Sequence, residues 1–226
     1  QYKRDAAALA KINSDKNLSV SGANVNDLDT LSADDEVTHI AITDTSANIA
    51  GALADLSAND KIDSITVSGN AAPFNLTVAE RTSYAATLGK FVGSYKLNIT
   101  NASISDAATL RNDSHVASMS ITDTATNIVG ALASLNGSDA KLHSLALSTS
   151  PGSLTMTAAQ WYQYQTVVAK ISTPYKVNIT GVAAAKVASL AADARVASVA
   201  VNDTTDHINS NLNVLQQNAN FVSSTT

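Results

Sequence analysis

The chain has 226 residues, of which 45% are hydrophobic and 15% charged, and its formal net charge is −5. This apolar share is enough to bury a continuous core and excludes a disordered chain. The 14 Lys and Arg residues are thinly spread, which argues against a nucleic-acid partner because neutralising phosphates requires a concentrated basic face. Cysteine is absent, which excludes disulfides, thiol nucleophiles and cysteine-based metal sites.

Two features of the chain bear on its context. No apolar run is long enough to span a bilayer, so we expect no transmembrane segment. The first residues, Gln-Tyr-Lys-Arg-Asp, include no initiator Met and lead into no apolar signal region. We therefore expect the sequence to be a fragment or processed piece of a longer protein.

The chain repeats itself with a period of about 80 residues. Ile42-Thr-Asp-Thr recurs as Ile121-Thr-Asp-Thr and as Val201-Asn-Asp-Thr. The same spacing is kept by Lys11-Ile12, Lys90-Phe91 and Lys170-Ile171. We therefore divide the chain into copy one (1–79), copy two (80–159) and an incomplete copy three (160–226), which together form a single array.

In chain order, alternating apolar residues predict strands, since a period of two is typical of a strand. The strands centre on Val20, Ile42 and Val67 in copy one, Ile99, Ile121 and Leu147 in copy two, and Ile179 and Val201 in copy three. A further strand is expected to begin at Phe221, where the sequence ends.

Between the strands, apolar residues at helical spacing predict three types of helix. The first type carries Val25, Leu28 and Leu31, matched by Ile104, Ala107 and Leu110, and by Ala184, Val187 and Leu190. The second carries Ile49, Leu53 and Leu56, matched by Ile128, Leu132 and Leu135, and by Ile208, Leu212 and Leu215. The third carries Leu88 and Phe91, matched by Val168 and Ile171.

Polar residues mark the expected starts of these helices, because the first-turn N–H groups need side-chain acceptors. Thr77 with Glu80 and Thr157 with Gln160 fit the capping box. The Asp-Thr pairs that begin at Asp44, Asp123 and Asp203 lie between strand and helix and are predicted to cap as well.

Consecutive predicted strands are separated by a long connection that includes a helix. Such strands must be parallel, because a tight hairpin cannot make that connection. We therefore predict an α/β fold: a right-handed parallel β–α solenoid, with three copies of the unit, each with three strands and three helices. The frame Val37-x-x-Ile40-x-Ile42-x-Asp44 resembles the strand frame of leucine-rich repeats. That resemblance concerns architecture, since Asp or Gly replaces the asparagine of that family.

In each predicted strand, one alternate set of side chains is aliphatic and faces the helices, and the other set is small and mostly polar. Binding solenoids usually carry large side chains on this face, since aromatics and Arg supply most binding energy. Three interpretations stay open: a solvated face, a face packed against a neighbouring subunit, or a hydroxyl lattice that binds a glycan or ice. The set comprises Ser19, Ser21, His39, Ala41, Thr43, Ser64, Thr66, Ser68, Asn98, Thr100, Ser118, Ser120, Thr122, Ser144, Ala146, Ser148, Asn178, Thr180, Ser198, Ala200 and Asn202.

The sequence contains no pattern typical of a catalytic or metal site. Asp-Thr-x-x-Asn offers oxygens that suit calcium, but the EF-hand Gly and Glu are missing and His207 replaces the Asn in copy three. We expect helix caps there and no cofactor, although calcium elsewhere stays open. The four histidines occupy different places in the repeat and predict no metal site. No serine lies in a nucleophile-elbow context, so we expect no enzyme.

Trp161, Tyr162 and Tyr164 form the one aromatic cluster that the sequence contains, and only copy three has the tryptophan. The cluster is either packing at a junction between copies or a contact with a partner or glycan. These three residues are the candidate interaction residues.

The run from Asp123 to Leu135, followed by Lys141-Leu-x-x-Leu and Leu154-Thr-Met-Thr-Ala-Ala-Gln, resembles repeats of very large bacterial type I-secreted and surface proteins, of the adhesin or surface-layer type. The resemblance implies export without a cleaved N-terminal signal and no catalytic residues. We expect a structural or adhesive module of an extracellular or cell-surface protein, whose partners are flanking repeats or other copies of itself. The alternative is a module that binds glycan or lipopolysaccharide through the Ser/Thr sheet face or the region of Trp161.

Overall fold

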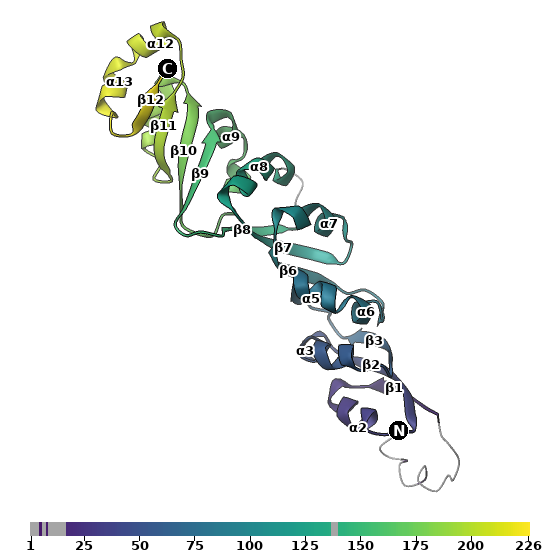
Figure 1. The fold of residues 1–226 in the computed structure, drawn as a ribbon. Helices are drawn as coiled ribbons and strands as arrows, with labels where there is room; N and C mark the ends of the chain where they lie inside the picture. Colours follow the sequence, from purple (N-terminus) through teal and green to yellow (C-terminus); the bar gives the residue numbers. More distant parts are fainter. Residues whose placement is uncertain (1–4, 6–7, 9–16, 137–139) are drawn as a thin grey trace. The chain divides into compact units, whose positions relative to one another are not determined.

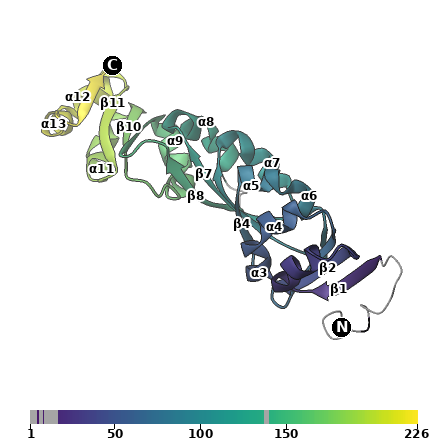
Figure 2. The same cartoon turned by 60° about the horizontal axis from the view of Figure 1, so that its bottom comes forward.

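The computed structural model describes residues 5, 8, 17–136 and 140–226. They form a mixed α/β structure with three four-stranded sheets (Figure 1). The chain divides into two compact units, Gln1–Thr100 with Ser114–Ala117 and Asn101–Asp113 with Ser118–Thr226. Figure 2 shows the same alternation of helices and strands after a turn of 60°.

The first sheet has the order β1-β2-β3-β5. Its strands are β1 (Leu18–Ala23), β2 (Val37–Thr45), β3 (Ile62–Ser68) and β5 (Phe91–Val92). The connections carry η1 (Val25–Asp27), α2 (Leu28–Ser32), α3 (Ser46–Gly51), α4 (Leu53–Ala58), α5 (Val78–Ser83) and α6 (Ala85–Leu88).

The second sheet has the order β4-β6-β7-β8. Its strands are β4 (Phe74–Thr77), β6 (Leu97–Ala102), β7 (Val116–Asp123) and β8 (Leu142–Leu147). Its connections carry η2 (Ile104–Asp106), α7 (Ala107–Asn112) and α8 (Ala125–Leu135).

The third sheet has the order β12-β11-β10-β9. Its strands are β9 (Gly152–Thr157), β10 (Tyr175–Val182), β11 (Val196–Val201) and β12 (Val222–Thr225). Its helices are α9 (Ala158–Gln163), α10 (Gln165–Val168), η3 (Ala184–Lys186), α11 (Val187–Ala191), α12 (Thr205–Ser210) and α13 (Leu212–Gln217).

The structure confirms the predicted strands and their direction. All eight predicted centres lie in strands, β12 begins beside Phe221, and the strands of all three sheets run parallel. The central strand of each copy buries its aliphatic residues, since Ile42, Ile121 and Val201 are each at most 1% exposed, whereas Val20 and Val67 are half-buried. Lys11 and Ile12, which belong to the predicted repeat, lie outside the described residues.

Three strands, β4, β5 and β9, were not predicted. Phe91 lies in β5, and Ile171 forms a parallel bridge with Leu145, so the prediction of a helical position is wrong for both. The apolar residues of β4 and β9 do alternate, but these segments directly follow Pro73 and Pro151. Proline is typical of a turn or connection, so the sequence indicated a connection at these two places and the strands were not predicted.

The strands β1, β6 and β10 each contain one residue with a left-handed backbone. These residues are Gly22, Asn101 and Gly181, with φ of 68°, 54° and 67°. The pairing of β1 with β2 and of β10 with β11 skips Gly22 and Gly181, as in a β-bulge. The next residue, Ala23 or Val182, is buried, so the bulge turns it into the core.

Candidate functional site

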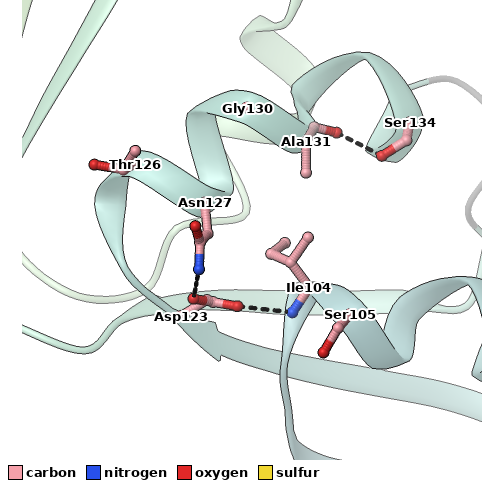
Figure 3. Close-up of a pocket in the computed structure, with 8 residues that line it drawn as sticks. All are labelled: Ile104, Ser105, Asp123, Thr126, Asn127, Gly130, Ala131 and Ser134. Atoms are coloured by element: carbon pink, nitrogen blue, oxygen red, sulfur yellow. Dashed lines mark hydrogen bonds between the residues drawn. The ribbon is translucent and has the colours of Figure 1, made fainter.

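The most strongly recurring polar arrangement is formed by Asp44, Asp123 and Asp203, which we call the clasp aspartates. Asp44 is the penultimate residue of β2, Asp123 is the last residue of β7, and Asp203 lies two residues after the end of β11. Each carboxylate accepts three hydrogen bonds. Figure 3 shows two of these bonds at Asp123, from Asn127 and from Ile104.

The Oδ2 atom of each clasp aspartate reaches back to the start of the preceding 3-10 helix. It accepts the backbone N–H of Val25 at 2.9 Å, of Ile104 at 2.8 Å and of Ala184 at 3.0 Å, in copies one, two and three. These donors lie 19 residues earlier in the chain. The carboxylate therefore ties the end of one strand to the loop that follows the neighbouring strand.

The Oδ1 atom organises the helix that follows. It accepts the N–H of the next threonine and bonds to a side chain four residues on, which is Asn48, Asn127 or His207 at 2.7 Å in each case. The threonine itself is the N-cap: Thr45, Thr124 and Thr204 each accept the backbone N–H three residues later. The predicted capping is thus confirmed for the threonine, whereas the aspartate mainly connects neighbouring segments.

These hydrogen bonds control the charge of the clasp aspartates. Partial burial raises the pKa of Asp44 and Asp123, but the three hydrogen bonds that each accepts outweigh it, so both pKa values lie below 3.8. At Asp203 the hydrogen bond from His207 is the main cause of the lowered pKa. All three side chains are therefore carboxylates at neutral pH.

We call each clasp aspartate together with its three hydrogen bonds a clasp. A surface pocket of about 540 Å³ lies beside the clasp of copy two, which is centred on Asp123. Figure 3 shows its eight lining residues, which come from η2, the end of β7 and α8. Asp123 and Asn127 are already engaged with each other, because Asn127 donates to Asp123. The other lining groups are small, aliphatic or carry hydroxyls: Ile104, Ser105, Thr126, Gly130, Ala131 and Ser134. These eight residues include no histidine or lysine that could transfer a proton to or from a ligand.

Lysines form a second recurring contact that the sequence analysis missed. Lys61 Nζ donates to the carbonyls of Ser32 and Asp34, and Lys141 Nζ donates to those of Arg111 and Asp113, at 2.7 to 2.9 Å. In both copies the acceptors lie at or just after the C-terminal end of the helix that precedes the neighbouring strand, α2 in copy one and α7 in copy two. The signal was a lysine that recurs just before a strand at equivalent positions of copies one and two, which copy three replaces with Phe221.

The three aromatic candidates differ in accessibility. Trp161 is 3% exposed and Tyr164 is 9% exposed, whereas Tyr162 is 52% exposed. The guanidinium of Arg195 lies 4.7 Å from the centroid of the Trp161 ring, an attractive cation–π geometry. Hydrogen bonds from Arg195 in turn lower the pKa of Asp193. Of the three, only Tyr162 offers a ligand a large surface.

The small residues of the sheet faces form short cross-strand contacts. The side chain of Asn98 donates to Asn75, that of Asn178 donates to Ser153, and Ser144 donates to Ser120, at 3.0 to 3.1 Å. None of the predicted outward residues is fully buried. The faces are therefore polar and partly to fully exposed.

Three of the four histidines have partners of their own. His39 pairs with Asp63 at 2.9 Å, His207 pairs with Asp203, and His115 stacks on Tyr95. Among residues 17–136 and 140–226, with Asp5 and Ala8, no group of three or more His, Asp or Glu side chains gathers in a way that could hold a metal ion.

Comparison of the chain with protein-family models, with curated proteins and with solved structures finds no match. In the part of the chain that the structure describes, none of the helices is both long and apolar enough to cross a bilayer.

Proposed function

We propose that the chain is a non-catalytic structural module in which three copies of one unit stack as a right-handed parallel β–α solenoid. The clasp supports this proposal most strongly. The same three hydrogen bonds recur at Asp44, Asp123 and Asp203, which occupy equivalent positions of the three copies. These bonds lie within each copy, and the contact between copies is strand pairing: β4 of copy one pairs with β6 of copy two, and β9 of copy two pairs with β10 of copy three. Copies that share the same internal geometry and are joined in the same way are the basis of a quasi-one-dimensional array.

The burial of the second helix type also supports stacking. Leu53 and Leu132 are 3% and 0% exposed, whereas the equivalent Leu212 of copy three is 54% exposed. In copies one and two, the strand near the end of the same copy packs on this type of helix, since β4 packs on α3 and β9 packs on α8. An apolar helix face that an equivalent strand covers in successive copies is a feature expected of an array.

The clasp aspartates themselves support a structural role. Each carboxylate holds three donors and has a lowered pKa, whereas a general acid or base needs a pKa near the working pH. Such a group stabilises the fold and is poorly suited to transferring protons.

We further propose that this array is an extended scaffold or adhesive segment of a protein on the bacterial cell surface. The resemblance of the repeat to surface proteins and the open, hydroxyl-rich faces support this location. An antibody against the purified chain should label intact source cells and lose its target after external protease treatment. Labelling only after permeabilisation would contradict the proposed location.

The stacking is tested by inserting a second 80–159 segment between Ala159 and Gln160. In a stacked array the added copy contributes its own stability and an interface, so the urea midpoint and the m-value both rise. A separate transition for the added copy, with the parent transition unchanged, would contradict stacking.

Glycan binding is the second candidate, and the exposure of Tyr162 together with the open polar faces favours it. A glycan array with the purified chain tests it, with Tyr162→Ala as the variant. This exposed residue is preferable to Trp161, whose substitution disturbs the fold. Saturable binding that Tyr162→Ala weakens supports this function, and the absence of binding contradicts it.

A further inference from the structure

Among the residues that the structure describes, the strand β1 pairs on one side only, which leaves its other edge open. It pairs with β2 and is the end strand of its sheet. The equivalent strands of copies two and three, β6 and β10, pair on both sides, because β4 pairs with β6 and β9 pairs with β10. Among the described residues, β1 alone of these three lacks a strand on that side.

The apolar side chains of β1 are correspondingly uncovered. Leu97 and Ile99 of β6 are each 1% exposed, and Val177 and Ile179 of β10 are at most 1% exposed. Their equivalents Leu18 and Val20 are only half-buried. Within the described part of the chain, the higher exposure goes with the neighbouring strand that β6 and β10 have and β1 does not.

The strands that fill this place in copies two and three share a pattern of apolar, polar, apolar and threonine. It reads Phe74-Asn-Leu-Thr in β4 and Leu154-Thr-Met-Thr in β9. The apolar residues are buried: Phe74, Leu76, Leu154 and Met156 are 0% to 5% exposed. The register is the same, with Phe74 opposite Leu97 and Leu154 opposite Val177.

The backbone of β1 presents the matching hydrogen-bonding groups. Leu18 donates its N–H to Glu36, toward β2. Because alternate residues of a strand point their N–H groups to opposite sides, the N–H groups of Ser19 and Ser21 point toward the open edge. In β6 the equivalent edge accepts β4, whose Phe74 N–H donates to the carbonyl of Lys96.

We propose that β1 is an acceptor edge for a parallel strand of the β4 type, supplied by another repeat unit of the same kind. This inference rests on the proposed stacking and goes further by naming the segment that joins one unit to the next. The incoming strand places its two apolar residues over Leu18 and Val20, in the register of β4 on β6. The docking is a strand addition, in which the main chain supplies affinity and the two apolar side chains supply specificity.

The test adds a second copy of the sequence Asn70–Ala79 directly before Gln1. This placement keeps the spacing from the added phenylalanine to Leu18 equal to the spacing from Phe74 to Leu97. The matched control carries Phe74→Asp and Leu76→Asp in the added segment only. The circular dichroism of both variants confirms that the chain remains folded.

Hydrogen exchange measured by NMR at the amides of Ser19 and Ser21 is the readout. With the apolar extension, we expect exchange at both amides to slow by about tenfold or more, as for amides that enter a sheet, and we expect the aspartate control to leave it unchanged. Equal exchange in both variants overturns the proposal, as does slow exchange at these amides in the unextended chain. If inserting residues 80–159 nevertheless raises stability, only the acceptor edge is refuted and the stacking stands.

Discussion

Each clasp aspartate is a single carboxylate that holds three donors from two neighbouring segments. Asp123 connects the end of β7, the start of α8 and the start of η2. An exposed hydrogen bond contributes little to the free energy of unfolding, but a charged acceptor that satisfies several donors at once contributes more. Substitution of a single clasp aspartate therefore tests directly how neighbouring segments are held together.

Asp123→Asn is expected to lower the free energy of unfolding by about 1–3 kcal/mol. The amide keeps the size of the side chain, but only its oxygen can accept, so its NH₂ group loses either the bond from the N–H of Ile104 or the bonds from Thr124 and Asn127. Urea unfolding at pH 7 measures the change. Asp60→Asn, at an exposed turn residue, is the control and should change stability little. An equal effect of both substitutions would contradict the role of the clasp.

The stability difference between the wild-type chain and Asp123→Asn is expected to depend on pH. The pKa of Asp123 in the folded chain lies below the ordinary value of 3.8, so its stabilisation is complete above about pH 5 and is lost as the pH falls through 3.8 toward the folded pKa. Urea unfolding at pH 7, 5 and 3 should show the same difference at pH 7 and 5 and a smaller one at pH 3. A difference that stays constant down to pH 3 would show that the carboxylate charge is not involved.

At the scale of elements, the helices are short and depend on their caps. The capping boxes predicted at Thr77 and Thr157 are both present, because Thr with Glu or Gln three residues on satisfies the first-turn donors locally. Such signals are local and could be predicted. The strands β4 and β9 were not predicted although their apolar residues alternate, because each directly follows a proline, Pro73 or Pro151, which is typical of a turn.

Thr157→Ala is expected to lower the free energy of unfolding by about 1 kcal/mol, since α9 loses its N-cap. For a chain of this size the melting temperature should fall by about 2–4 °C. Differential scanning calorimetry measures it. Thr155→Ala, an exposed position on the same strand, should leave the melting temperature nearly unchanged, and an equal fall in both variants would argue against the cap.

Trp161→Ala is expected to destabilise the chain by about 3–5 kcal/mol, because this side chain is buried on α9 beneath Arg195. The sequence identified Trp161 as an unusual residue and left packing and binding open, since its burial depends on Arg195, which is distant in sequence. Urea unfolding compares the free energies of unfolding of Trp161→Ala and Tyr162→Ala, and we expect a large loss for the buried tryptophan and a small one for the exposed tyrosine. Similar, small effects of both would show that Trp161 is not a core residue.

At the scale of the whole molecule, the sequence predicted the α/β class, the eight strand centres and the parallel direction, because each follows from apolar periodicity and connection length. The clasp was predicted only in part. The threonine cap follows from local sequence, whereas the reach of Asp44, Asp123 and Asp203 to N–H groups 19 residues earlier requires the two strands to be neighbours. The periodicity of apolar residues does not show which strands are neighbours in a sheet.

The central claim is that the recurrence in sequence is a recurrence in space. Because the chain has no cysteine, spin labels can be placed cleanly at the exposed, equivalent positions Thr43, Thr122 and Asn202. Pulsed electron resonance on the cysteine pairs should give narrow and equal distances for Thr43→Cys with Thr122→Cys and for Thr122→Cys with Asn202→Cys, and a longer one for the outer pair. Broad or clearly unequal distances for the two adjacent pairs would contradict a stacked array.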